Sequence, residues 1–495
     1  MDLGIDLGTT YTVAAAVDRG NYPVVAFTDL DGDSHEHFPS VTAVVDGALV
    51  HGYEALDAVT RGAPAIRSLK RALASSSVTS STTVRIGTRS FTLGEVLTDY
   101  LTTVAGQIRE ATGAPELRAV IGVPAHAHTG QRFVTMEAFR AAGIEVLGIV
   151  NEPSAAGLEY ALRQARSLNS RRTRVLVYDL GGGTFDASLV DMSGTQGEVV
   201  DSVGLNDLGG DDFDGVLEGL VRSLVTTPMP GTEDLRESCR LAKEAIRPQS
   251  RHVVVDLPDE AVRVPVADYE RACRSLVDRT LAVMEPLSGL LADDPGHSDV
   301  AGIHMVGGAT CLPVVARRVR EVYGRRVHRS PHPTSATAVG LAIAADPDSV
   351  YGIRDRLSRG FGVFRETDAG RAVSFDVLVD QTTLLDGSTT VSRRYQARHN
   401  LGVYRFVEFQ RAEDGVPRGD LTPFATVVVP LDAALQAGEA PLDPTDVHEV
   451  EHGHWVEERY VVEPTGIVRA TVTDLDTGWS LTTTMGVDRP DVRRA

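Results

Sequence analysis

Two glycine-rich turns of the same pattern constrain the fold of this chain more than any other feature of its sequence. One lies in Gly4-Ile5-Asp6-Leu7-Gly8-Thr9-Thr10-Tyr11, and the other in Asp179-Leu180-Gly181-Gly182-Gly183-Thr184-Phe185-Asp186. In both, an apolar strand leads into an Asp, a turn with Gly and Thr follows, and a second strand begins. Glycines let the backbone approach phosphate oxygens closely, and successive N–H groups of such a turn bind anions. The pair therefore predicts two similar lobes with a nucleotide between them.

Strands alternate with helical segments through about the first 345 residues. Apolar strands are expected at 119–124 and 146–150, with a helix at 131–142 between them. This alternation predicts a mostly parallel sheet covered by helices on both faces. Ligands of such sheets bind at the carboxyl ends of the strands, where Glu152 is expected.

The net charge narrows the classes of partner. The chain has 48 Lys and Arg residues against 68 Asp and Glu residues, which gives a formal charge of −20 at pH 7. Such a charge repels the phosphate backbone of nucleic acids and the surface of anionic membranes. We therefore expect neither a nucleic acid nor a membrane as a partner.

Cysteine content and hydropathy bear on the compartment. The cysteines Cys239, Cys273 and Cys311 are too few and too scattered for a disulfide framework or a zinc site. The chain opens directly into a strand, and no apolar run approaches the roughly 20 residues of a membrane span. These features predict reduced thiols in a cytoplasmic protein.

Lysine is almost absent from the chain. Only Lys70 and Lys243 occur, so arginine supplies nearly all of the 48 basic residues. The two residue types are not interchangeable where a compact charge must meet a phosphate or a water molecule. Both lysines are therefore candidates for a role at the nucleotide.

The motifs, taken together, resemble the 70-kDa heat-shock chaperone family, a branch of the actin-like ATPase fold. Besides the two turns, the resemblance rests on four segments in family order: Val123-Pro124-Ala125, Asn151-Glu152-Pro153, 208–214 and Met305-Val306-Gly307-Gly308-Ala309. It implies a two-lobed α/β actin-like (ribonuclease H-like) ATPase domain followed by an all-β sandwich. The expected boundaries are 1–345 for the ATPase domain, 346–358 for a linker, 359–486 for the sandwich and 487–495 for a tail.

The resemblance also implies a role for each matching residue. Lys70 corresponds to the catalytic lysine that holds the attacking water, and Thr184 to the threonine that contacts the γ-phosphate. Asp6, Glu152 and Asp179 correspond to the carboxylates around Mg²⁺, K⁺ and their waters, with ATP or ADP as the nucleotide. The catalytic set is thus Lys70, Glu152, Asp179 and Thr184. The implied nucleotide-binding residues are Gly8, Thr9, Thr10, Tyr11, Gly181, Gly182, Gly183, Gly210, Asp211, Lys243, Gly307, Gly308 and Ala309.

Departures from the family gather on the base side of the expected pocket. Arg240 and Arg247 stand where the family usually has Glu and Ser, Cys311 replaces an adenine-stacking Arg, and Thr334 stands where Asp is frequent. One lost hydrogen bond to a charged group costs about 1.5–3 kcal/mol, so we expect the nucleotide to bind more weakly or to exchange faster. The region 214–235 is shorter than in typical members, which makes a dedicated exchange factor doubtful.

The second half of the chain has a different pattern. Short alternating strands at 373–379, 403–409, 426–431, 455–462 and 468–472 predict an antiparallel sandwich. It resembles the family's peptide-binding β-domain, here expected without a helical lid because the sequence stops at Ala495.

Two further segments of this half leave alternatives open. The linker segment 350–356 lacks the family's apolar run, which leaves coupling between the domains open. His448, His452 and His454 have a spacing that suggests a metal, although a solvated His-rich turn explains them better.

These features predict a DnaK-type ATPase that hydrolyses ATP slowly and binds unfolded or extended polypeptide, with a J-domain co-chaperone as an implied partner. An alternative keeps the fold as a nucleotide-sensing scaffold whose sandwich docks one dedicated protein partner. A small-molecule kinase is disfavoured, because no base beside an acceptor hydroxyl is evident and a trailing sandwich has no place in that class.

Overall fold

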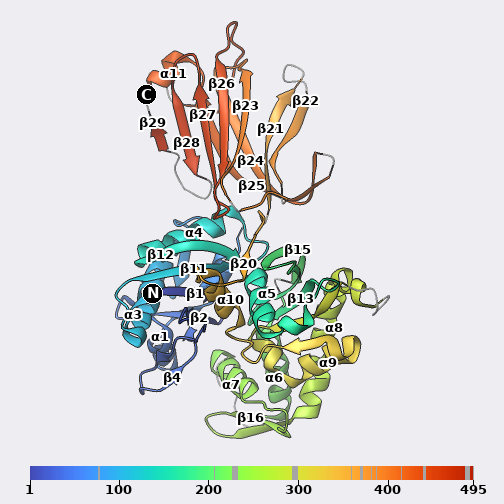
Figure 1. Ribbon diagram of the computed structural model, residues 1–495. Helices are drawn as coiled ribbons and strands as arrows, with labels where there is room; N and C mark the ends of the chain where they lie inside the picture. Colours follow the sequence, from blue (N-terminus) through green and yellow to red (C-terminus); the bar gives the residue numbers. More distant parts are fainter. Residues whose placement is uncertain are drawn as a thin grey trace. The chain divides into compact units, whose positions relative to one another are not determined.

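Figure 1 shows the protein as a computed structural model. The structure describes residues 1–75, 78–205, 207–225, 232–292, 299–357, 359–367, 372–380, 382–385, 387–413, 415–438, 442–484 and 491–493. The chain forms two compact units. The first comprises 1–69, 103–125 and 150–353, and the second comprises 70–102, 126–149 and 354–495. The first unit thus ends inside the predicted linker, and the domain boundary at 345 stays a prediction.

The first sheet of the first unit is built around β1. This strand (Asp2–Leu7) pairs in parallel with β11 (Leu117–Val123) and antiparallel with β2 (Tyr11–Ala16), which in turn pairs with β5 (Phe38–Pro39). The strands are nearly all buried, as their apolar sequences require. Around this sheet lie β3 (Phe27–Thr28), β4 (Ser34–His35), β6 (Val41–Val45), β7 (Ala48–His51), α1 (Gly52–Thr60) and β8 (Ala65–Arg67).

The second sheet repeats this arrangement. Its central strand β13 (Arg174–Leu180) pairs in parallel with β18 (Val300–Val306) and antiparallel with β14 (Phe185–Asp191). The full order is β19 (Val327–Arg329), β18, β13, β14, β15 (Gln196–Leu205) and β20 (Gly352–Ile353). The predicted parallel pairing is found between β1 and β11, between β13 and β18 and between β18 and β19, but both sheets are mixed, because each glycine-rich turn folds its two strands into an antiparallel hairpin.

Two helices pack between strands of the two sheets. Helices α5 (Glu152–Arg163) and α10 (Ala336–Ala345) share one apolar core with β2 and β13. They cross so closely that a Cβ atom on Gly340 would lie 1.8 Å from the carbonyl oxygen of Ala155. The rest of the unit comprises η1 (Ala165–Ser167), α6 (Gly210–Leu224), α7 (Thr232–Glu244), β16 (His252–Asp256), β17 (Ala261–Pro265), α8 (Val266–Ala292), η2 (Gly308–Cys311), α9 (Pro313–Tyr323) and η3 (Gly324–Arg326).

The linker segment begins as a strand of the first unit. Gly352 and Ile353 of β20 pair in parallel with Gln196 and Gly197 at the edge of the second sheet. Tyr351 packs beside them against the core that α5 and α10 share. The weak apolar character of the segment therefore suffices for strand addition.

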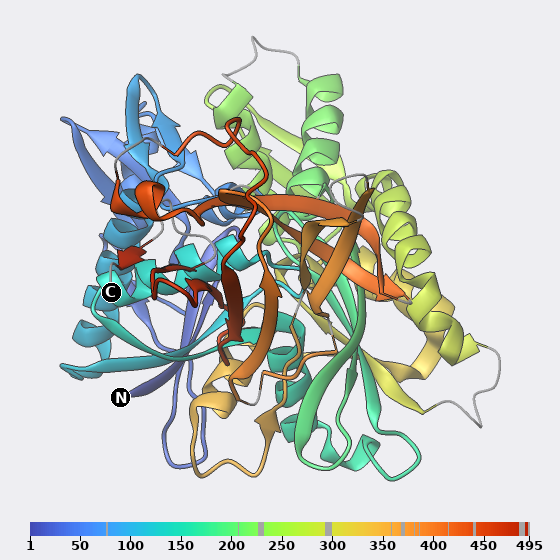
Figure 2. The ribbon, with the colours of Figure 1, turned by 90° about the horizontal axis from the view of Figure 1, so that it is seen from above.

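Two antiparallel sheets dominate the second unit, orange to red in Figures 1 and 2. One has the order β22 (Ala372–Val379), β21 (Gly360–Thr367), β24 (Leu401–Glu413), β25 (Val416–Pro430). The other has the order β23 (Thr389–Gln396), β26 (Trp455–Val462), β27 (Val468–Asp474), β28 (Ser480–Thr484), β29 (Asp491–Arg493). Inward residues of both sheets, such as Phe361, Phe406 and Tyr460, form one core. The five strands predicted in this half are confirmed.

The remaining elements are assigned wholly or partly to the second unit: α2 (Leu69–Leu73), β9 (Thr83–Ile86), β10 (Arg89–Thr92), α3 (Leu93–Thr112), α4 (Thr129–Ala141), β12 (Ile144–Asn151) and α11 (Ala433–Ala437). Helix α4 contacts the sandwich through Glu408 of β24. This carboxylate accepts hydrogen bonds from the Nδ1 of His128 and the backbone N–H of Thr129, both 2.8 Å long.

Candidate functional site

The two glycine-rich turns have the same geometry. The N–H of Gly8 donates to the carbonyl of Tyr11, and the N–H of Gly181 donates to that of Thr184, each over 3.0 Å. Asp6 and Asp179 occupy equivalent places, one residue before the last residue of β1 and of β13. The predicted phosphate-binding hairpins are thus two copies of one local structure.

The turns also approach one another. A Cβ atom on Gly182 would lie 1.9 Å from the hydroxyl oxygen of Thr10, so the second turn needs glycine at this point. Gly307, which follows β18, has a φ of 85°, and a Cβ there would lie 2.4 Å from an oxygen of Asp179. Thr10, Gly182, Asp179 and Gly307 therefore surround one small region of the first unit.

Glu152 and Gly122 lie side by side at the end of the first sheet. Glu152 is the first residue of α5, and a Cβ on Gly122 of β11 would lie 3.2 Å from the Cγ of Glu152. Gly308 and Ala309 begin η2, directly after Gly307. Glu152, Gly308 and Ala309 are thus found at helix starts, beside the ends of strands.

The start of α6 is fastened to the second turn. The N–H groups of Gly210 and Asp211 donate to the carbonyls of Gly181 and Gly182, over 2.9 and 2.8 Å. At the same helix end, a carboxylate oxygen of Asp212 accepts from the N–H of Gly209. Because a helix N-terminus attracts anions, this end of α6 adds to the anion-binding character of the turn.

Lys243 is buried and held by two internal partners. Its Nζ lies 2.9 Å from the carbonyl of Gly210 and 2.7 Å from a carboxylate oxygen of Asp214. Burial raises the pKa of Asp214 to about 6, and the lysine charge opposes that rise. An ammonium group has three N–H donors, so one donor remains for the nucleoside contact that the sequence predicts.

Arg240 connects α7 to the first turn. Its Nη1 donates to the hydroxyl of Tyr11 over 2.8 Å and to Glu244 over 2.9 Å, and its Nη2 donates to Glu237 over 2.5 Å. Glu237 also meets Arg67 at 3.3 Å. Sequence reasoning noted Arg240 only as a departure; the acidic residues three before and four after it were the signal for its ion pairs.

The other base-side residues lie near the turn after β18 or the end of α7. Cys311 ends η2 and is exposed, while Cys239 and Cys273 are buried, and none of the three forms a disulfide. A Cβ on Gly308 would lie 3.6 Å from the methyl group of Thr334. The guanidinium of Arg247 donates to the carbonyl of Glu244 over 2.8 Å.

Lys70 is the predicted catalytic residue that belongs to the second unit. It is the second residue of α2. Its predicted role rests on the sequence match, whereas Asp6, Asp179 and Thr184 also lie on the two hairpins.

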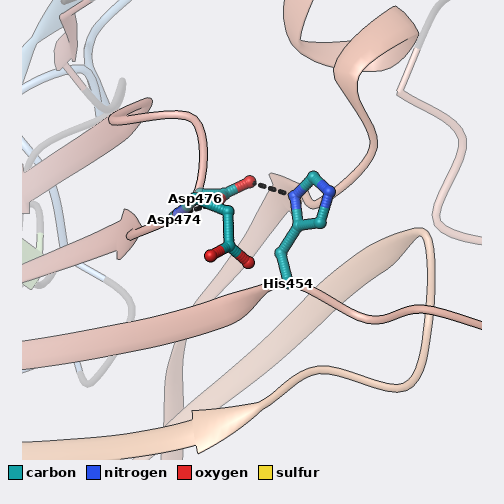
Figure 3. Close-up of side chains that lie close together, drawn as sticks. All are labelled: His454, Asp474 and Asp476. Carbon is teal, nitrogen blue, oxygen red and sulfur yellow. Dashed lines mark hydrogen bonds and ion pairs between the residues drawn. The ribbon is translucent and has the colours of Figure 1, made fainter.

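One residue of the histidine-rich segment, His454, lies beside two aspartates. Figure 3 shows His454 beside Asp474 and Asp476, with His454 Nδ1 2.6 Å from an oxygen of Asp474. The same oxygen accepts from Gln436, the other accepts from the N–H of Asp476, and Asp476 itself accepts from the N–H of Trp455. These bonds fasten the start of β26 to the end of β27. Among the described residues, His448 and His452 are not in this group.

In the part of the chain that the structure describes, no helix combines the length and the hydropathy that crossing a bilayer requires.

Comparison with known proteins gives a consistent family. Residues 2–350 match the family model described as Hsp70 protein. The chain is 31% identical to the chaperone protein DnaK of Mycoplasmopsis agalactiae over 69% of its own length and 58% of that protein's. It is 28% identical to the chaperone protein DnaK of Metamycoplasma hominis, over 84% of this chain and 74% of that protein. It is 31% identical to the chaperone protein DnaK of Thermotoga petrophila, over 85% of this chain and 75% of that protein. The match to the first of these relatives thus spans less than two thirds of that relative's length. This chain belongs to the Hsp70 family.

Proposed function

We propose that the protein is a DnaK-type chaperone that hydrolyses ATP slowly and binds extended polypeptide through its β-sandwich. The observation that carries this proposal is the pair of identical hairpins whose turns meet at Thr10 and Gly182. Each presents backbone N–H groups to an anion, and α6 adds a helix N-terminus. A triphosphate between the turns satisfies both hairpins at once.

The residues around the turns suit phosphoryl transfer to water. This reaction needs positioning and charge stabilisation more than covalent chemistry from the protein. Asp6, Glu152 and Asp179 offer the hard carboxylate oxygens that hydrated Mg²⁺ prefers, and K⁺ has the same preference. Mg²⁺, when bound, neutralises charge on the phosphates. The hydroxyl of Thr184 contacts the γ-phosphate, and Lys70 orients the attacking water.

The sandwich is the proposed polypeptide site. Within the described residues, β22 and β23 each pair on one side only, so each leaves one strand edge to which an extended peptide can add. In this proposal the protein acts in the cytoplasm, and a J-domain co-chaperone is a partner. A dedicated exchange factor is not required by it.

One observation favours the second candidate, a scaffold for one dedicated protein. The sandwich interior contains Glu458, fully buried, whose carboxylate accepts hydrogen bonds from Arg365, Tyr395 and Tyr460. Such a network has one geometry and repacks poorly, whereas a site for many clients needs adaptable apolar contacts.

The ATPase proposal is tested by single-turnover hydrolysis of labelled ATP. Lys70→Ala and Thr184→Ala should each lower the rate by about 10²–10³, the usual loss when one preorganised group is removed. Arg71→Ala, which removes the neighbouring positive charge, should leave the rate within about threefold. Unchanged hydrolysis in Lys70→Ala contradicts the proposal. Affinity capture then separates the two candidates, because many unfolded clients indicate the chaperone and one stoichiometric partner indicates the scaffold.

A further inference from the structure

The first unit contains a cavity of about 680 Å³ that the proposed function does not use. Four segments far apart in the sequence line it: the loop after β2 with Asn21, the end of α5 with Arg163 and the Gln164 that follows it, the end of β19 and the loop after it with Arg329 and Pro331, and α10 with Val339. None of the nucleotide-site residues named above is among its lining residues. The cavity is therefore separate from the hairpins.

The charged residues that line the cavity are all positive. Two arginines and two side-chain amides face a cavity that no aspartate or glutamate lines, in a chain whose formal charge is −20. Two carboxylates bond to lining residues: Asp346 accepts the hydroxyl hydrogen of Tyr22 over 2.9 Å, and Glu159 accepts from Arg163. Of these two acids, only Glu159 forms an ion pair with a lining arginine among the described residues.

Arg163 is held in place from behind. Its Nε donates to Glu159, which is fully buried and also bonds with His304 Nε2 at 2.8 Å and Ser330 Oγ at 3.3 Å. A guanidinium has five N–H donors, and only the Nε–H is used here. The Nη groups of Arg163 have no hydrogen-bond partner in the part of the chain that the structure describes.

Arg329 supplies the uncompensated charge. It ends β19 and is exposed, and among the described residues its guanidinium forms no hydrogen bond or ion pair. Planar guanidinium groups recognise carboxylates and phosphates by paired, charge-assisted hydrogen bonds. We propose that this cavity binds a small oxyanion, the phosphate or carboxylate group of a small molecule, between Arg163 and Arg329.

The loop that follows Arg329 reaches the nucleotide site. The carbonyl of Pro333 accepts the N–H of Gly307 over 2.9 Å, and Thr334 lies against Gly308. A ligand that orders Arg329 and Pro331 therefore acts on the turn beside Asp179. This second step rests on the proposed function: the anion should change nucleotide affinity, and by linkage the nucleotide should change anion affinity by the same factor.

Calorimetric titration of the full chain tests the site with two probes, inorganic pyrophosphate and citrate, in the presence of saturating ADP and Mg²⁺. One equivalent should bind, and Arg329→Ala should weaken binding by about tenfold or more, since a charge-assisted contact is lost. The control is Arg325→Ala, which replaces an exposed arginine four residues earlier; this variant should bind the probes as tightly as the parent protein does. If only pyrophosphate binds, the ligand is a phosphate; if only citrate binds, the ligand is a carboxylate. Equal binding by Arg329→Ala, or no binding of either probe at millimolar concentration, overturns the site.

The coupling has its own readout. The Kd of fluorescent ADP is measured with and without the probe that binds, in the parent and in Arg329→Ala. A shift in the parent that Arg329→Ala removes supports the coupling. If the probe binds but the Kd for ADP is unchanged, the coupling is wrong and the anion site stands. If ADP itself does not bind, the proposed function fails, while the dependence of probe binding on Arg329 still decides the anion site.

Discussion

The guanidinium of Arg240 donates a hydrogen bond of 2.8 Å to the hydroxyl of Tyr11. Tyr11 directly follows the first glycine-rich turn, while Arg240 lies on α7, one helical turn before Lys243 and its bond to Gly210. The pair of Glu237 with Arg67 adds a second connection. Helix α7, whose Lys243 bonds to the start of α6 beside the second hairpin, is thereby also tied to the first hairpin.

These contacts predict that Arg240 slows the release of bound nucleotide. Arg240→Ala removes charge-assisted bonds of a side chain that is only 13% exposed, so ADP should leave about tenfold faster, by stopped-flow fluorescence of labelled ADP. Arg236→Ala, an exposed arginine of the same helix, is the matched control. Equal release rates in the two variants would show that the Arg240 contacts do not restrain the nucleotide. The parent's own rate tests the sequence-based expectation of faster exchange.

Gly307 should not tolerate a side chain. Its φ of 85° disfavours other residues, and a Cβ would lie 2.4 Å from both Asp179 and the carbonyl of Leu180. Gly307→Ala should lower the free energy of unfolding by about 1–3 kcal/mol and weaken ATP binding, because the strain falls on the turn beside Asp179. Gly215→Ala in α6, where a Cβ meets nothing within 4 Å, is the control. Urea unfolding and ATP titration measure both effects; a fully stable Gly307→Ala contradicts the geometry.

Glu457 and Glu458 form a matched pair of ion-pairing residues. Glu458 is fully buried against Arg365, whereas Glu457 pairs with Arg394 at the surface. Removing one partner of a buried ion pair lowers the free energy of unfolding by about 3–5 kcal/mol. Glu458→Ala should therefore destabilise the protein strongly. Glu457→Ala should cost under about 1 kcal/mol, as exposed pairs do. Chemical denaturation checks this, and similar losses in the two variants would refute the assigned difference.

The contact of Glu408 with α4 should make stability depend on pH. Burial alone would raise the pKa of Glu408, but hydrogen bonds from His128 and Thr129 hold it below its usual range. A carboxyl group whose pKa is lower in the folded state than in the unfolded state stabilises the fold at pH values above its unfolded pKa of about 4.3. That stabilisation is lost as the pH falls through the folded value.

The measurement is the free energy of unfolding of the parent and of Glu408→Gln from pH 3 to 7. The difference between them should be largest above about pH 5 and shrink below about pH 4. Glu413→Gln, an exposed residue at the end of the same strand, should show little difference at any pH. A difference for Glu408→Gln that stays constant across the range would contradict the assignment.

Local features were predictable from the sequence because their causes are local. The Gly and Thr residues of the two turns specify the hairpins, and alternation of apolar residues identified the strands of the sandwich. Contacts between distant residues were not predictable in this way. Arg240 meets Tyr11, and His454 meets Asp474, only because the fold brings their elements together. The sequence likewise could not show that 126–149 clusters with the sandwich, since contacts such as those of Glu408 with His128 and Thr129 join residues far apart in the chain.

The most direct test of the account is single-turnover ATP hydrolysis with and without an extended hydrophobic peptide, with Lys70→Ala as the blank. We predict hydrolysis that depends on Lys70 and becomes faster when the peptide is present. ATP binding with neither hydrolysis nor a response to the peptide would contradict the chaperone ATPase and leave the scaffold as the account of this protein.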